Sequence, residues 1–339
     1  MSGHVSAVLG RLGRTQIRYV DSVSPSRADP YVARIYRQVD RDFGVLAPPV
    51  ILHAPARGAL AASWMLVREI LVVPGPAGRA AKEAVAAAVS EANACPFCVT
   101  IHQAALDVLG DSTATGPLVD WFAAETGVPP FPAAWLPELI GTAVGLHYLN
   151  RMVNIFLGER PLPPGVPARA LGPVLRVLRR LIRRAATGPH EPGQSLALLP
   201  PAALPADLGW AASSPNVADA VSRAAAAFEL AGTRSVPPRV RELLAAELAD
   251  WAGDKRGPSR AWVEDLVVRL PPVERAAGRL VLLTAFASYQ IERSVVDDCG
   301  LDDRALVELT SWAGMAAARR IGERLWLAAR QSRAASEPN

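Results

Sequence analysis

The hydrophobic and polar positions along the chain follow the spacing of helices rather than that of strands. Residues 78–93 (GRAAKEAVAAAVSEAN) are rich in Ala and Glu and predict a helix of about four turns that stops near Asn93. Similar alanine- and leucine-rich segments predict further helices over Ala218–Ala231, Arg239–Trp251, Ala261–Leu270, Arg275–Ile291 and Asp303–Gln331. Runs that alternate apolar and polar residues are scarce, so we expect an all-α fold.

Proline-rich stretches divide the 339 residues into parts. PLPPGVP at Pro161–Pro167 and LPPAALP at Leu199–Pro205 are typical of linkers. They predict an N-terminal domain over residues 1–160, a proline-rich and basic bridging segment over residues 161–216, and a C-terminal helical domain over residues 217–335. A length of this size suits two ordinary domains.

A weak internal repeat relates the two predicted domains. A shift of 196 residues lays Glu83–Asn93 on the equally helical Arg279–Tyr289. At the same shift the candidate redox residues are not repeated in the second copy: Cys95, Cys98 and His102 align with Ile291, Ser294 and Asp298. We therefore expect two related helical units, of which the second is degenerate.

Composition and charge exclude several classes of protein. Half of the residues are hydrophobic and 20% are charged, which is typical of a folded globular chain and not of a disordered one. The 36 basic and 32 acidic residues leave a net charge of only +4. This small excess does not indicate a nucleic-acid-binding protein, which would concentrate basic residues in a patch.

One basic cluster is nevertheless present. Its arginines alternate with apolar residues at helical spacing and are Arg176, Arg179, Arg180, Arg183 and Arg184. The pattern predicts an amphipathic helix, which could bind an anionic membrane or a nucleic acid through its cationic face. We expect instead that the helix packs its leucines on the protein body and leaves its arginines in solvent.

Targeting signals are not apparent in the sequence. The apolar run near Val8 and Leu9 is interrupted by Arg11, Arg14 and Arg18 before an export signal could form. The apolar stretch Leu280–Ile291 falls short of the roughly 18–20 residues that a membrane span needs. Three cysteines in a chain of this length indicate a reducing compartment. We expect a cytoplasmic protein without a membrane span.

The segment from Asn93 to His102 (NACPFCVTIH) carries the clearest chemical signal. Pro96 is suited to the first position of a helix, which puts Cys95 at the N-cap and Cys98 in the first turn. The positive end of the helix dipole should then lower the thiol pKa into a reactive range. His102 follows Cys98 by four residues and lies on the same helix face, where an imidazole can exchange a proton with the thiol.

The spacing therefore predicts a redox-active dithiol with its own proton acceptor. Cys95 lies close enough to form a disulfide with Cys98. A carboxylate on the preceding helix would complete a proton relay, and spacing alone leaves both Glu83 and Glu91 as candidates.

Other readings of C-x-x-C fit less well. A haem attachment site needs His directly after the second cysteine, where this chain has Val99. A structural zinc site needs four ligands, and the chain has no second C-x-x-C. A thioredoxin motif would follow a strand rather than a long helix. Two buried structural cysteines beside a satisfied histidine stay possible. We expect no metal and no cofactor.

The run from Glu83 through Cys95 and Cys98 to His102 resembles the core motif of AhpD-like alkylhydroperoxidases in the carboxymuconolactone decarboxylase superfamily. The flanking segments Phe43–His53 and His147–Phe156 also look like stretches of bacterial members. The resemblance covers roughly residues 30–160, and the C-terminal half is similar to a degenerate second copy.

This resemblance implies an all-α, oligomeric AhpD-like fold and assigns roles to four residues. Cys98 would be the peroxidatic thiol and Cys95 the resolving thiol, while Glu83, rather than Glu91, would form the proton relay with His102. One departure is Phe97, which occupies the position between the cysteines where the best-studied members carry a histidine.

The function expected from the residues and the resemblance is that of a thiol-dependent peroxidase, an antioxidant oxidoreductase of the peroxiredoxin type. It would reduce hydroperoxides and be recycled by a dithiol on a lipoyl group or a thioredoxin-like protein. Two alternatives stay open. One is a thiol–disulfide oxidoreductase or redox sensor that uses the same pair. The other is a carboxymuconolactone decarboxylase-like enzyme, which the presence of both cysteines disfavours.

The remaining histidines and the third cysteine carry weaker signals. His147 lies on an apolar helical segment and is expected in the core, with the substrate pocket as the alternative. His53 is expected to be structural, and His4 and His190 to be exposed. Cys299 has acidic neighbours that disfavour a thiolate, so we expect it to be unreactive.

Overall fold

The computed structural model describes residues 10–110, 112–124, 126–254 and 256–335. Throughout these ranges the regular secondary structure is helical, which confirms the all-α prediction. The helices of the N-terminal half are α2 (Pro30–Phe43), α3 (Pro48–Ile51), α4 (Arg57–Leu66), the π-helix η1 (Val67–Val72), α5 (Gly78–Ala92), α6 (Pro96–Leu109), α7 (Ser112–Ala124), η2 (Ala133–Trp135) and α8 (Leu136–Phe156).

The bridging segment and the C-terminal half contain the remaining helices. These are η3 (Ala168–Ala170), α9 (Leu171–Ala186), η4 (Leu196–Leu198), η5 (Ala206–Ala211), α10 (Pro215–Ser235), α11 (Pro238–Ala249), α12 (Ala261–Val267), η6 (Pro272–Glu274), α13 (Arg275–Phe286), η7 (Ser288–Gln290), α14 (Arg293–Asp297) and α15 (Asp303–Ala334). The helix predicted over Arg275–Ile291 ends early, at Phe286, because the backbone of Ala287 leaves the helical region.

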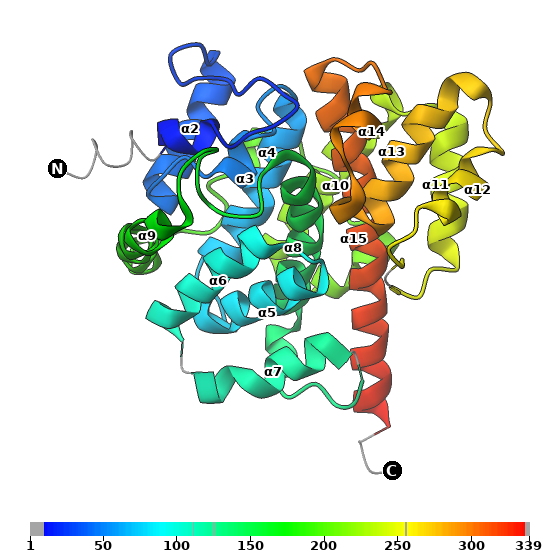
Figure 1. The fold of residues 1–339 in the computed structure, drawn as a ribbon. Coiled ribbons are helices and arrows are strands. Elements are labelled where there is room, and N and C mark those ends of the chain that lie inside the picture. The colour runs from blue at the N-terminus through cyan, green and yellow to red at the C-terminus, as the bar shows by residue number, and fades with distance from the viewer. Residues whose placement is uncertain (1–9, 111, 125, 255, 336–339) are drawn as a thin grey trace.

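The two halves pack around the long helix α8. Its 21 residues are almost all buried, as expected for a helix that is apolar on every side. It lies against α5 from its own half and against α15 from the other half (Figure 1). The helix α10 also packs on α4, so the halves share one hydrophobic core. The repeat relation between them stays a prediction.

The turn between α5 and α6 places the cysteine motif. The helix α5 ends at Ala92, with Asn93 as its C-cap. Ala94 then takes a left-handed conformation with φ 49°, where the chain turns toward α6. Cys95 is the N-cap of α6 and Pro96 its first residue, as predicted from the sequence. The two helices lie side by side, so residues of α5 face the start of α6.

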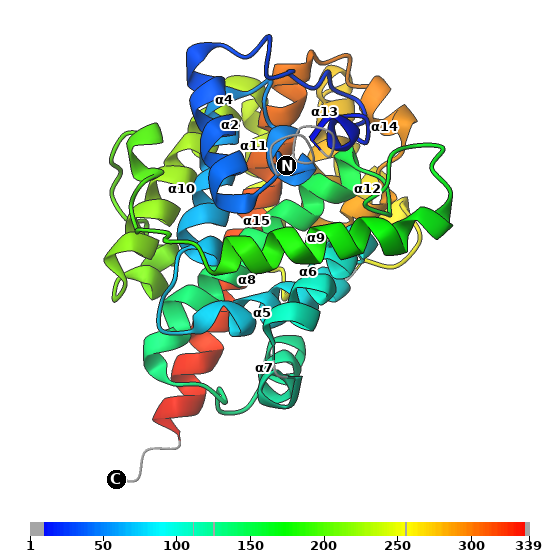
Figure 2. The same cartoon turned by 90° about the vertical axis from the view of Figure 1, so that its left-hand side faces the viewer.

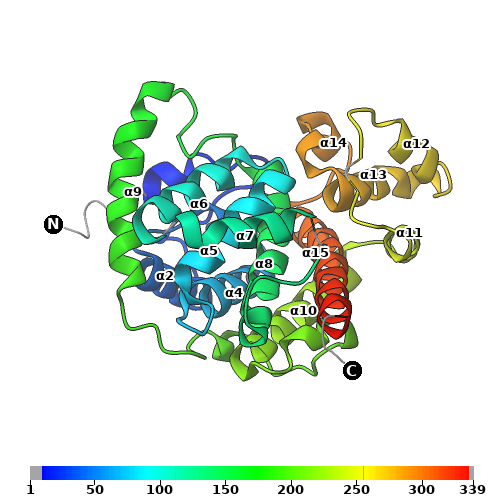
Figure 3. The same cartoon turned by 90° about the horizontal axis from the view of Figure 1, so that it is seen from below.

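The basic helix α9 packs on the body through its apolar side. It lies across α6 and also contacts α2 (Figure 2). Ile182 is buried beneath it, while four arginines are exposed: Arg176, Arg180, Arg183 and Arg184. Seen from below, α9 forms one edge of the molecule, and α11 to α14 form a lobe on the far side (Figure 3). Packing on the body is the arrangement expected from the sequence.

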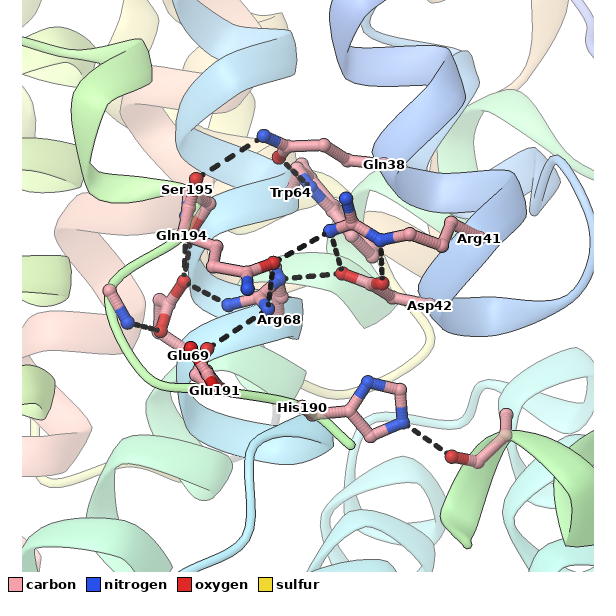
Figure 4. Close-up of polar contacts among 12 residues, drawn as sticks. Gln38, Arg41, Asp42, Trp64, Arg68, Glu69, His190, Glu191, Gln194 and Ser195 are labelled. Atoms are coloured by element: carbon pink, nitrogen blue, oxygen red, sulfur yellow. Dashed lines mark hydrogen bonds and ion pairs between the residues drawn. The ribbon is translucent and has the colours of Figure 1, made fainter. Parts of the chain in front are cut away.

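A buried polar network fastens the bridging segment to the N-terminal half (Figure 4). The guanidinium of Arg68 is fully buried and donates to Asp42 and to Glu69, each at 2.6 Å. The Glu69 carboxylate accepts hydrogen bonds from the main chain and the hydroxyl of Ser195, at 2.9 and 2.7 Å. The network therefore ties η1 both to α2 and to residues 191–195.

Two expectations about exposed histidines have different outcomes. His190 was expected in solvent but is buried, because its segment folds back and its ring nitrogen donates to the main-chain carbonyl of Ala185 at the end of α9. That prediction is wrong. His4 lies outside the described residues.

Membrane insertion was not expected from the sequence. Over the described ranges, no helix combines the length and the apolar character that a bilayer crossing requires.

Candidate active site

Cys95 and Cys98 lie together in the core at the start of α6. Their side chains are 1% and 4% exposed, and both are free thiols. The two thiols are in hydrogen-bonding contact with each other, and the side chain of Asn150 on α8 also bonds to Cys98. The pair therefore has the proximity that disulfide formation would need.

The electrostatic setting of Cys98 differs from the prediction. Its contact with the Cys95 thiol, together with burial, raises the pKa of Cys98 well above its usual value. The hydrogen bond from Asn150 acts in the opposite direction but is weaker. The expected lowering by the helix N-terminus is thus outweighed, because a buried thiolate beside a second thiol loses its hydration. A raised pKa favours the protonated thiol, so a nucleophilic role for Cys98 would need a base to take its proton.

Glu83 and His102 form a buried hydrogen-bonded pair, and His102 lines the same cavity as Cys98. The Nδ1 atom of His102 lies 2.7 Å from Oε2 of Glu83, and Arg79 donates to the other carboxylate oxygen at 2.7 Å. Arg79 and His102 outweigh the effect of burial and lower the pKa of Glu83 to about 2. The ionised carboxylate can only accept, so Nδ1 of His102 donates to it, and Nε2 is the ring nitrogen that points away from this bond.

The structure separates the two glutamates that spacing alone could not. Glu83 is buried against His102, whereas Glu91 is exposed near the end of α5. The four residues predicted as a site therefore lie in one region, on the facing sides of α5 and α6. Their catalytic roles stay predictions.

The low pKa of Glu83 predicts a pH dependence of stability. The folded state holds this carboxylate ionised down to about pH 2, while the unfolded chain protonates it near its ordinary value of 4.5. The stabilisation is present above pH 4.5 and is lost as the pH falls toward 2. At about 1.4 kcal/mol per pKa unit the loss is of the order of 3 kcal/mol.

Denaturant unfolding between pH 7 and pH 2.5 measures this effect. On acidification, the free energy of unfolding of the Glu83→Gln variant should fall by about 3 kcal/mol less than that of the wild type. Glu91→Gln changes an exposed glutamate of the same helix and should follow the wild type. Equal acid sensitivity of Glu83→Gln and the wild type would refute the assignment of the carboxylate.

An apolar cavity opens onto Cys98 and His102. Its volume is about 140 Å³, and both side chains are part of its lining. Apart from them and Gln16, the wall is built from apolar residues and Gly13; among these are Val67, Leu71, Phe97, Ile101, Leu146 and Leu149. The outer helix α9 contributes Val174 and Leu178, so it closes one side of what we call the active-site cavity. The arrangement places a thiol and an imidazole in the wall of an apolar pocket.

A known protein is similar to this chain over nearly its whole length. The chain is 35% identical over 340 residues to the alkyl hydroperoxide reductase Rv2159c of Mycobacterium tuberculosis, and the match covers 92% of this chain and 95% of the relative. The chain belongs to the AhpD-like alkylhydroperoxidase family. No protein-family model and no solved structure matches it. The resemblance carried by residues 83–102 is thereby confirmed.

Several polar residues around the cysteines of this AhpD-like protein were missed by sequence reasoning. Asn93 donates to Asn150 at 3.0 Å and accepts from Asn154, through its main-chain carbonyl, at 3.1 Å. Asn150 also donates to Ser90 at 3.2 Å. These bonds hold the α5–α6 turn against α8. The sequence feature that could have pointed to these asparagines is the set of polar residues at helical spacing within the otherwise apolar segment HYLNRMVN.

The position between the cysteines is apolar in this AhpD-like protein. Phe97 is buried and forms part of the wall of the active-site cavity. Phe97 therefore offers no proton-accepting group between the cysteines, and the predicted relay is left with His102 and Glu83.

Three further residues, His53, His147 and Cys299, lie outside the cysteine site. His53 is buried and bonds to the carbonyl of Val50 and the hydroxyl of Tyr148, which supports a structural role. His147 is buried and lines a second cavity. Burial and the neighbouring Asp298 raise the pKa of Cys299 to about 11, which agrees with an unreactive thiol. Within the described ranges, no three His, Cys, Asp or Glu side chains are grouped so as to hold a metal ion.

Proposed function

We propose that this protein is a thiol-dependent peroxidase that reduces organic hydroperoxides through Cys98 and Cys95. The observation that carries the proposal is the apolar cavity whose lining includes both the Cys98 thiol and His102, with Glu83 bonded behind the imidazole. The relative's name, alkyl hydroperoxide reductase, supports the same reaction.

The first step is an attack by Cys98 on the hydroperoxide. His102 takes the thiol proton through Nε2, and the thiolate attacks the terminal oxygen of the peroxide. The O–O bond breaks, the proton passes to the departing alkoxide, and an alcohol leaves while Cys98 becomes a sulfenic acid. The Glu83 carboxylate compensates the positive charge that His102 carries during the transfer.

The second step returns the sulfur to a stable state. The Cys95 thiol attacks the sulfur of the Cys98 sulfenic acid, water leaves, and a disulfide forms. A dithiol then reduces this disulfide and is itself oxidised to a disulfide. We propose a lipoyl group or a thioredoxin-like protein as the reductant, and a homo-oligomer in the cytoplasm as the working form.

A peroxide-consumption assay tests the proposal. The purified protein should consume cumene hydroperoxide with dihydrolipoamide as the electron donor. A parallel assay of insulin disulfide reduction distinguishes a peroxidase from the main alternative, a thiol–disulfide oxidoreductase. Rapid disulfide reduction with no peroxide consumption would show a thiol–disulfide oxidoreductase and contradict the proposal.

The composition of the cavity wall predicts a substrate preference. Burial of apolar surface contributes about 0.8 kcal/mol for each buried CH₂ group, so the carbon skeleton of an organic hydroperoxide should raise kcat/KM by at least about tenfold relative to hydrogen peroxide. Steady-state rates with cumene hydroperoxide, tert-butyl hydroperoxide and hydrogen peroxide measure this preference.

Two variants of α9 sharpen the experiment. Val174→Trp adds bulk to the cavity wall and should remove the preference for organic hydroperoxides. Val177→Trp places the same bulk on the same helix, at a residue outside the lining, and should keep it. A protein that reduces hydrogen peroxide as fast as cumene hydroperoxide would show that the cavity does not select the substrate.

A further inference from the structure

A second cavity lies between the two halves of the molecule and is separate from the active-site cavity. Its volume is about 200 Å³, and it is lined by Asn93, His147 and Arg151 on one side and by residues of the C-terminal half on the other. The residues of α8 that line the active-site cavity are different ones, Leu146 and Leu149. The two cavities therefore contact different faces of the same helix.

A buried cation forms the polar end of this second cavity. Arg151 is 5% exposed, and its guanidinium donates to the main-chain carbonyls of Ala285 and His147 at 3.0 and 2.6 Å. In the part of the chain that the structure describes, no carboxylate lies within ion-pair distance of it. Burial lowers the pKa of Arg151 to about 10, so it stays charged at neutral pH. A buried charge that only neutral groups contact is unfavourable, and an anion would compensate it.

Other ionisable residues lie close to this end of the cavity. Burial, with smaller contributions from Arg151 and Arg324, holds the pKa of His147 well below its usual value, which favours the neutral imidazole. Gly253, at φ 91°, leaves room for Arg324, whose Nη1 lies 1.9 Å from where a β-carbon would sit. Asp254 is the acidic residue in the lining. The single charge of Arg151 matches a ligand with a single negative charge.

Aromatic rings form another part of the cavity wall. Phe122, Trp251, Phe286 and Tyr289 line it, and the Trp251 and Phe286 rings meet edge to face with centroids 5.0 Å apart. The polar atoms of these rings are already bonded: Trp251 donates to the carbonyl of Asp254 and Tyr289 to that of Arg256. The Arg256 guanidinium lies over the Phe286 ring, 5.2 Å from its centroid, and the ring surface that is left can contact an apolar ligand.

We propose that this cavity binds a small organic monocarboxylate. The carboxylate would bond to Nη2 of Arg151, since Nε and Nη1 already donate to Ala285, His147 and Asn93, and the aromatic or aliphatic body would lie between the rings. Inorganic phosphate fits less well, because it brings a second charge toward Asp254 and no apolar body for the rings.

Titration calorimetry on the full chain tests the proposal with defined probes. Benzoate should bind saturably in the millimolar range or tighter. Benzyl alcohol, which has the same ring without the charge, and inorganic phosphate should each bind at least about tenfold more weakly. Absence of benzoate binding, or equal binding of benzyl alcohol or phosphate, would overturn the proposal.

Three variants locate the site. Arg151→Met should weaken benzoate binding about ten- to a hundredfold, the effect of losing hydrogen bonds to a charged group. Because Arg151 also joins the two halves, Ala92→Trp is a second variant; it fills the cavity from an exposed lining residue and should abolish binding. Ala134→Trp makes the same change at an exposed alanine outside the lining and should bind as the wild type does. Unchanged binding in Ala92→Trp would refute this location.

Discussion

The Cys98→Ser variant should lose peroxide consumption down to the rate of the uncatalysed reaction with the dithiol, a decrease of at least about a hundredfold. A serine hydroxyl in the same cavity is a far weaker nucleophile toward peroxide oxygen, and it cannot form a sulfenic acid. The oxygen is nearly isosteric with the sulfur, so the start of α6 should keep its structure. Initial rates with cumene hydroperoxide and dihydrolipoamide measure the loss.

Two companion variants identify the cause of that loss. Cys95→Ser should still react once with peroxide but accumulate the sulfenic acid at Cys98, because the resolving thiol is absent. Cys299→Ser removes the third thiol, which lies outside the cysteine site, and should keep the wild-type rate. If Cys98→Ser retained most of the activity, the peroxidatic role of this residue would be wrong.

The Arg68→Met variant should lose about 3–5 kcal/mol of unfolding free energy. Arg68 is completely buried and contacts the carboxylates of Asp42 and Glu69, which are also buried. Methionine fills part of the space but leaves both carboxylates without this cation. Such a loss is a large fraction of the roughly 5–15 kcal/mol that stabilises a typical domain. Denaturant unfolding at neutral pH measures it.

Arg41→Met is the matched control, because Arg41 contacts the same Asp42 carboxylate from a side chain that is 56% exposed. An ion pair in solvent contributes about 1 kcal/mol or less. Limited proteolysis should also cut residues 191–195 sooner in Arg68→Met, since Arg68 donates to the carbonyl of Glu191. Equal destabilisation by the two variants would show that burial does not set the strength of the network.

The local structure of the cysteine motif could be predicted from the sequence because it depends on neighbouring residues. Pro96 can only begin a helix at that position, so Cys95 had to precede it and His102 had to share a face with Cys98. The end of α5 at Asn93 followed from helix propensity in the same way. The motif's resemblance to the AhpD-like family supplied the choice of Glu83.

The surroundings of the motif could not be predicted, because they depend on packing between distant segments. Asn150 reaches Cys98 from a helix more than fifty residues further along the chain. The raised pKa of Cys98 follows from the Cys95 contact and from burial. Residue spacing does not show how strongly these two effects oppose the helix dipole. The wall that α9 adds to the active-site cavity likewise requires the fold.

The central claim is that Cys98 and Cys95 form a redox pair that peroxide oxidises. Addition of one equivalent of cumene hydroperoxide to the reduced protein, followed by alkylation of free thiols and peptide mass spectrometry, tests it most directly. We predict a disulfide between Cys95 and Cys98, with Cys299 alkylated as a free thiol. Recovery of Cys98 as an alkylated thiol after the peroxide has been consumed would contradict the account.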